Sequence, residues 1–153
     1  MVNSLETAIR SAGEYFDSGY ICSESVLLAI SRTMRIESDL IPRIATGFGG
    51  GLSRTCSTCG AVNGAVMAIS LFYGRNSPDE TQLRAYEAVR RFLAAFRERF
   101  GFFNCLELTG VDLGTEEGYD AYWAKGLHEK CNEITARAVE MAMSIIETRG
   151  ESD

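Results

Sequence analysis

The chain has 153 residues, of which 46% are hydrophobic and 24% are charged. These proportions suit a globular protein with one domain spanning residues 1–153. The formal net charge of −6 at pH 7 argues against nucleic-acid binding, which relies on clustered Lys and Arg to neutralise phosphates. The first 20 residues do not resemble a targeting peptide, and no run reaches the roughly 18 apolar residues of a membrane span. We therefore expect a cytoplasmic protein without a membrane partner.

In the first half of the chain, apolar residues recur at helical spacing in three segments. One segment lies before Gly19, and a second begins just behind Cys22. Residues 49–51 are three consecutive glycines, which predict a loop because glycine does not favour regular structure. The third segment covers residues 60–74, where Gly60, Gly64 and Ala68 place a small residue at every fourth position. That spacing predicts a helix face that a neighbouring helix can approach closely.

The second half of the chain contains further helix signals. A capping Ser, a Pro and two acidic residues at 77–80 predict the start of the longest helix, with apolar residues on one side as far as Phe100. Residues 104–107 resemble a capping box and predict a short helix that Gly110 closes. The last helix is expected to begin near Cys131, whereas residues 112–126 stay unassigned. No segment alternates like a strand, so we predict an all-α, single-domain multi-helix bundle with short connecting loops.

Cysteines are the residues that point most directly to chemistry. Four of the five stand at expected helix starts: Cys22, Cys59, Cys105 and Cys131. Free backbone N–H groups and the helix dipole favour a thiolate there, and the thiolate is the form that attacks disulfides and binds metals. A shared site is the simplest reason for this placement, so we expect the four side chains to converge. The alternative is that each cysteine is a small buried apolar residue.

Cys56 and Cys59 form a Cys-x-x-Cys motif, which brings two sulfur atoms within reach of one metal or one disulfide. The βαβ setting of thioredoxin is absent from the predicted elements, and Gly60 stands where a c-type haem motif requires His. We expect Cys59 to be the most reactive or most tightly ligating thiol, because a helix follows it directly. Cys56 is expected to matter less.

Several other residues leave two interpretations open. The sole histidine, His128, is either a ligand or proton carrier near Cys131 or a solvent-facing side chain. Arg54 either favours a thiolate or is simply solvated. The glycine run lacks the ending of a phosphate-binding P-loop, so a tight loop is the better interpretation. The remaining candidates either line a pocket or anchor a loop on the core: Tyr119, Tyr122 and Trp123.

Two runs of the sequence carry a family resemblance. They are Gly47-Phe48-Gly49-Gly50-Gly51 and Cys59-Gly60-Ala61-Val62-Asn63-Gly64-Ala65, with Cys22 upstream and Cys105 and Cys131 downstream. Together they resemble the C_GCAxxG_C_C family of redox-active proteins over about residues 22–146. The family label places Gly before Cys, whereas Cys59 precedes Gly60 here, and Cys56 lies outside the four named cysteines. A similar helical segment is associated with split-Soret cytochromes, so the resemblance implies redox activity and an iron–sulfur centre.

The sequence is compatible with three functions. In the first, a small redox or electron-transfer protein holds an iron–sulfur cluster on Cys22, Cys59, Cys105 and Cys131, because soft thiolates suit such a cluster. In the second, a cofactor-free thiol–disulfide oxidoreductase uses Cys59 as nucleophile and Cys56 or a distant cysteine to resolve it. In the third, structural zinc on the same four cysteines supports a non-catalytic helical binding module. We expect a redox partner protein. Whether the chain is an enzyme, and whether it forms a homo-oligomer, stays open.

Overall fold

In the computed structural model, which describes residues 3–151, the chain folds into helices joined by short connections. The only strand-like pairing in that range is an isolated antiparallel bridge between Thr58 and Asn104. This confirms the predicted all-α fold. In chain order the helices are α1 (Ser4–Asp17), α2 (Cys22–Thr33), η1 (Arg43–Phe48), α3 (Gly49–Leu52), α4 (Gly60–Tyr73), α5 (Leu83–Phe100), α6 (Cys105–Thr109), α7 (Glu116–Ala124), α8 (Leu127–Glu147) and η2 (Thr148–Glu151).

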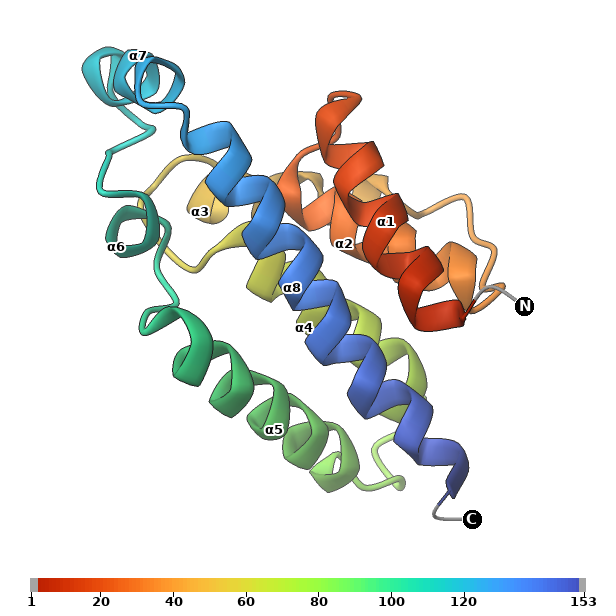
Figure 1. Ribbon diagram of the computed structural model, residues 1–153. Helices are drawn as coiled ribbons and strands as arrows, with labels where there is room; N and C mark the ends of the chain where they lie inside the picture. The colour runs from red at the N-terminus through yellow and green to blue at the C-terminus, as the bar shows by residue number, and fades with distance from the viewer. Residues whose placement is uncertain (1–2, 152–153) are drawn as a thin grey trace.

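Helix α8 is the central helix of the bundle. It packs against α1, α2, α4 and α5, and the short helices α3, α6 and α7 gather near the end at which it begins (Figure 1). The core between these helices consists of fully buried apolar side chains such as Ile30, Ile69, Phe92 and Val139. Within residues 3–151, no helix combines enough length with enough hydropathy to span a bilayer.

The predicted small-residue face of α4 is confirmed by its packing on α2. A Cβ atom on Gly64 would lie 2.6 Å from the backbone oxygen of Ser23 and 3.1 Å from Cβ of Val26. The two helices therefore approach each other almost backbone to backbone at Gly64. A side chain at this position would push α2 and α4 apart, because the nearest atom belongs to the main chain and not to a flexible side chain.

The predicted start of the longest helix at residues 77–80 was wrong. The hydroxyl of Ser77 accepts a hydrogen bond from the N–H of Asp79 at 3.1 Å, and the Ser77 carbonyl accepts one from the N–H of Glu80 at 3.1 Å. These bonds form a turn, and α5 begins only at Leu83. Ser, Pro and Asp favour turns as well as helix starts, so the pattern fits both structures. The longest helix is α8, with 21 residues against 18 in α5.

The start of the last helix was also misplaced, by about one turn. Helix α8 begins at Leu127 behind Gly126, which has a φ of 66°. Cys131 therefore lies inside the helix and not at its mouth. The unassigned segment before it contains α7, whose N-terminus is capped by the Thr115 hydroxyl, which accepts a hydrogen bond from the N–H of Gly118 at 3.0 Å. Only three of the four cysteines therefore stand at helix starts.

The glycine run forms a turn of left-handed helix where the sequence predicted a loop. Residues Gly50 to Arg54 all have positive φ values, between 56° and 69°. The N–H of Ser53 donates to the Gly49 carbonyl at 2.8 Å, and the N–H of Arg54 donates to the Gly50 carbonyl at 3.0 Å. Glycine makes the first part of this turn accessible, since it adopts positive φ without steric cost.

The α2–α4 contact leads to a test of stability. We expect Gly64→Ala to lower the free energy of unfolding by about 1–3 kcal/mol, because overpacking against a backbone cannot be relieved by a side-chain rotation. Urea denaturation followed by circular dichroism measures the change. Gly13→Ala in α1 is the matched control, because its new Cβ would meet the side chain of Asn132 at 3.2 Å. The control should stay within about 1 kcal/mol of the parent protein, and an equal loss in both variants would contradict the proposed packing constraint.

Candidate functional site

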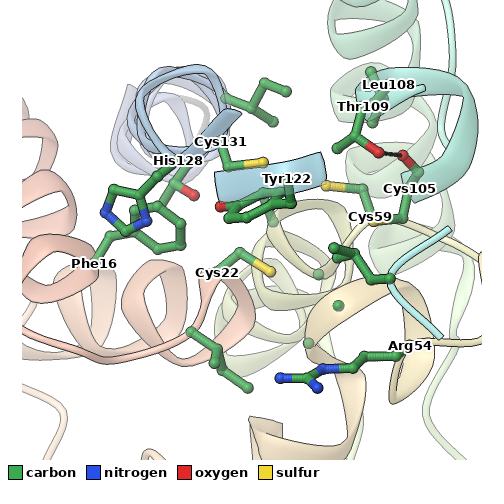
Figure 2. A pocket seen from close by; sticks show the side chains of 18 of the residues that line it. Phe16, Cys22, Arg54, Cys59, Cys105, Leu108, Thr109, Tyr122, His128 and Cys131 are labelled. Carbon is green, nitrogen blue, oxygen red and sulfur yellow. Dashed lines mark hydrogen bonds between the residues drawn. The ribbon is translucent and has the colours of Figure 1, made fainter. Parts of the chain in front are cut away.

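Four cysteines line one cavity of about 630 Å³ at the end of the bundle (Figure 2). Cys22 is the first residue of α2, Cys59 is the N-cap of α4, and Cys105 is the first residue of α6. Cys131 reaches the same cavity from the second turn of α8. The structure thus brings together the four cysteines that the sequence singled out as a set. All four are free thiols, and their side chains are buried or half-buried.

Gly60 brings the sulfur of Cys22 next to the start of α4. A Cβ atom on Gly60 would lie 2.3 Å from Cys22 Sγ and 3.0 Å from the Cα of Gly49. The sulfur therefore occupies the space that any larger residue at position 60 would need. Backbone N–H groups of Gly50 and Gly60 donate hydrogen bonds to this sulfur. The glycines around Cys22 supply both room and hydrogen-bond donors.

Two backbone hydrogen bonds tie the Cys59 segment to the Cys105 segment. The N–H of Cys59 donates to the Phe103 carbonyl at 2.7 Å, and the N–H of Cys105 donates to the Ser57 carbonyl at 2.8 Å. Gly51 completes the contact, because a Cβ atom there would lie 2.5 Å from Cβ of Cys105. The starts of α4 and α6, which are 46 positions apart in the sequence, are thereby held together.

Tyr122 brings α7 into the site. Its hydroxyl donates a hydrogen bond to the sulfur of Cys131, and its side chain is buried and lines the cavity between the labelled cysteines (Figure 2). The sequence suggested a pocket role for this residue only as one of two interpretations, because residues 112–126 had no assigned structure. The signal that could have found it is the acidic first turn behind Thr115, which marks the start of α7.

Cys56 is not part of the cavity lining. Its thiol donates a hydrogen bond to the carboxylate of Asp112, and that carboxylate also accepts one from the N–H of Gly114 at 2.8 Å. The hydrogen bond raises the pKa of the Cys56 thiol and lowers the pKa of Asp112. Cys56 therefore lies outside the lining to which Cys59 belongs, although it is near enough to Cys105 to contribute to the raised pKa of that thiol.

Burial raises the pKa of all four cavity thiols, in contrast to the expected effect of the helix starts. Loss of water raises the pKa of Cys105 to about 12 and that of Cys131 to about 11, with smaller contributions from neighbouring cysteines. The pKa values of Cys22 and Cys59 are raised for the same reason. Backbone N–H groups of Ala61 and Val62 do lower the pKa of Cys59, as expected at a helix start, but desolvation outweighs them.

Aromatic side chains line another part of the cavity, among them Phe16, Trp123 and His128. The ring of His128 is stacked between Phe16 and Trp123, with centroid distances of 4.4 Å and 5.3 Å. Its Nε2 atom lies 3.2 Å from Asp17 Oδ1. This nitrogen therefore faces Asp17 and not the cysteines, and the stacked ring is not a free solvent-facing side chain. Arg54 lies over the ring of Tyr119, 4.6 Å from its centroid. It makes no contribution to the pKa shifts of the four cavity thiols.

The arrangement of the four cysteines decides which metal group they could hold. Within residues 3–151, no three side chains of His, Cys, Asp or Glu lie close enough to hold one metal ion. The four cysteines therefore line one cavity without forming such a group. Their chemistry is that of soft ligands, which favour iron–sulfur clusters, zinc and copper(I).

The sequence matches a known protein family. A family model described as "Putative redox-active protein (C_GCAxxG_C_C)" matches residues 20–145. The chain belongs to the C_GCAxxG_C_C family. An uncharacterised protein of Archaeoglobus fulgidus is 28% identical over 149 residues, which cover 91% of this chain and 93% of the relative. No solved structure matches the chain. In this member of the family, Gly60 makes room for a cysteine sulfur and Gly64, one turn later, makes room for the backbone of α2.

The burial pattern predicts the order in which the thiols react with iodoacetamide in the reduced, metal-free protein. Cys56 should be alkylated first at pH 8, because only about one in a thousand Cys131 thiols is ionised when its pKa is about 11. Alkylation of Cys131 and Cys105 should then rise about tenfold per pH unit as the pH approaches their pKa values. Quenched samples analysed by peptide mass spectrometry give the order. Faster labelling of Cys59 than of Cys56 would instead support the reactivity expected from its helix start.

Proposed function

We propose that the protein is a small redox protein in which Cys22, Cys59, Cys105 and Cys131 hold an iron–sulfur cluster and exchange electrons with a partner protein. The observation that carries this proposal is that four thiols from four different helices line a single cavity. Four cysteines complete the usual ligand set of a [2Fe–2S] or [4Fe–4S] cluster. The family description supports the redox part of the proposal.

A cluster and a single zinc ion place different demands on four thiolates. A structural zinc site needs four ligands around one point, at Zn–S distances of about 2.3 Å. In a cluster the thiolates bind different iron atoms, so their sulfur atoms lie farther apart. Zinc has no redox chemistry, so the redox description of the family favours the cluster over structural zinc.

The raised pKa values supply a second argument for a metal centre. Four thiols buried together stay protonated at neutral pH, because each additional thiolate would be poorly solvated and would repel the others. A bound metal reverses this balance, since its positive charge deprotonates a coordinating thiol. When bound, the cluster would accept and release electrons, while the chain's own residues position it and limit its contact with water.

A cofactor-free thiol–disulfide oxidoreductase is the alternative. The specific observation in its favour is that Cys22 lies close enough to Cys59 to contribute to the raised pKa of the Cys59 thiol. Such an enzyme needs a thiolate at neutral pH, however, and burial opposes ionisation of both thiols. The pair of Cys59 and Cys56 is less suited to the role, because Cys56 is bound to Asp112 outside the cavity lining.

Single cysteine-to-serine variants test the cluster. In anaerobically purified protein we expect visible charge-transfer absorption with bound iron and sulfide. Each of Cys22→Ser, Cys59→Ser, Cys105→Ser and Cys131→Ser should lose most of the iron, because serine removes the soft sulfur ligand. Cys56→Ser is the matched control and should retain the parent content. Iron and sulfide analysis, with circular dichroism to verify folding, gives the comparison.

Two outcomes of this experiment would contradict the proposal. Colourless parent protein that takes up no iron after anaerobic reconstitution with iron and sulfide would favour the oxidoreductase alternative. Colourless protein with stoichiometric zinc would favour the structural metal site.

Tyr122 provides a further test, of how the chain would adjust a bound cluster. Tyr122→Phe removes the hydrogen bond to the Cys131 sulfur while it keeps the ring. A hydrogen bond to a ligand sulfur stabilises the more negative, reduced cluster, so the variant should have a lower reduction potential, by up to about 60 mV. A redox titration followed by visible absorption measures the shift. An unchanged or higher potential would show that this hydrogen bond is not made to a cluster ligand.

A further inference from the structure

We infer that the open side of the cavity binds a planar aromatic molecule that carries an anionic group. The inference concerns the same cavity as the proposed function, but it depends on the residues around the cavity mouth and not on a metal. In Figure 2, Phe16 and His128 lie on one side of Tyr122, whereas Cys59 and Cys105 lie on the other. The volume of about 630 Å³ is within the range of about 300–1,000 Å³ that small-molecule sites occupy.

A continuous series of aromatic rings forms one wall of this site. The ring centroids of Tyr119 and Trp123 are 6.4 Å apart, those of Trp123 and His128 are 5.3 Å apart, and those of His128 and Phe16 are 4.4 Å apart. All four residues line the cavity. Trp123 is 52% exposed although it is the largest side chain of the set. Such a wall offers ring surface to a flat ligand, because aromatic pairs gain stability from stacking and edge contacts.

The anionic group is inferred from Arg54. This residue lines the cavity, and within residues 3–151 its guanidinium has no carboxylate at ion-pair distance. Its guanidinium lies 4.6 Å from the centroid of Tyr119, and Figure 2 shows Arg54 below Cys22 and Cys105 in the view. Arginine pairs well with carboxylate, sulfonate or phosphate groups because its N–H donors form a planar fork. In a chain with a net charge of −6, this cation beside an aromatic wall selects for an anionic ligand.

Thr135 is an independent indication that the cavity takes a polar partner. Its side chain lines the cavity and is fully buried, yet its hydroxyl has no hydrogen-bond partner within residues 3–151. Most buried hydroxyls are paired, because an unpaired one loses its hydrogen bonds to water without replacement. A ligand atom that can donate or accept a hydrogen bond would satisfy it. An aromatic molecule with a carbonyl group as well as an anionic group meets both requirements.

Anthraquinone-2-sulfonate is a suitable probe, because it is planar, anionic and carries carbonyl oxygens. Trp123 is the only tryptophan in the chain, so its fluorescence reports on this site alone. We expect saturable quenching with one probe bound per chain and a Kd below about 100 μM. Arg54→Gln should weaken binding about tenfold or more, because it removes a charge-assisted hydrogen bond. Arg54→Lys, which keeps the charge, should recover part of the loss.

Arg84→Gln on α5 is the matched control, since it removes one positive charge away from this cavity and should leave the Kd unchanged. Titrations are performed on both metal-free and iron-reconstituted protein, with circular dichroism to verify the fold of each variant. Binding to either form supports the inference whether or not iron is retained, so the result is separate from the test of the cluster. The inference is overturned if neither form shows saturable quenching up to about 1 mM probe. It is also overturned if Arg54→Gln and Arg84→Gln weaken binding equally.

Discussion

The close approach of α2 and α4 is the contact on which the site depends. At Gly64 the backbone of α2 occupies the space of a missing side chain, and at Gly60 the sulfur of Cys22 does so. Because both glycines belong to one face of α4, a single helix contact determines how far Cys22 lies from Cys59. Larger residues at either position would separate the helices and open the cavity. In this protein, the spacing of the family motif is therefore a packing requirement as well as a chemical one.

The second constraint is electrostatic and acts on the thiols that this packing brings together. A helix start favours a thiolate, but only where water or another positive charge helps to solvate it. Around Cys59 the backbone N–H groups are present, yet removal of water has the larger effect and raises its pKa. Four such thiols in one cavity form a poor set of nucleophiles and a good set of ligands, because a metal supplies the positive charge that the protein does not. This balance is the physical basis for preferring a cluster over thiol–disulfide exchange.

The sequence was sufficient to predict the fold class, most of the longer helices and the close-packed face of α4, because apolar periodicity and the small-residue spacing at Gly60 and Gly64 are local signals. It did not predict α7, which lies in the segment left unassigned. It was less reliable at helix starts. The turn at Ser77 and the helix start at Leu127 depend on which of several capping residues the tertiary structure uses. The expectation that helix starts favour a thiolate gave the wrong direction for the thiol pKa values, since these depend mainly on the burial of each sulfur. The exclusion of Cys56 likewise depends on Asp112, which is 56 positions away in the sequence.

The left-handed turn from Gly50 to Arg54 connects the fold to the chemistry of the cavity. Left-handed helical backbone costs roughly 1–2 kcal/mol for each residue that has a Cβ atom, and three of the five residues have one. Strain of this size persists only where the surrounding structure compensates for it. Here the one turn places the N–H of Gly50 at the sulfur of Cys22, Gly51 against Cys105, and Arg54 at the cavity mouth. A right-handed turn would change the direction of all three groups, so relaxation of the strain would dismantle one side of the cavity. This run of consecutive positive-φ residues is thus found where two cysteines and the cationic side chain have to be positioned together.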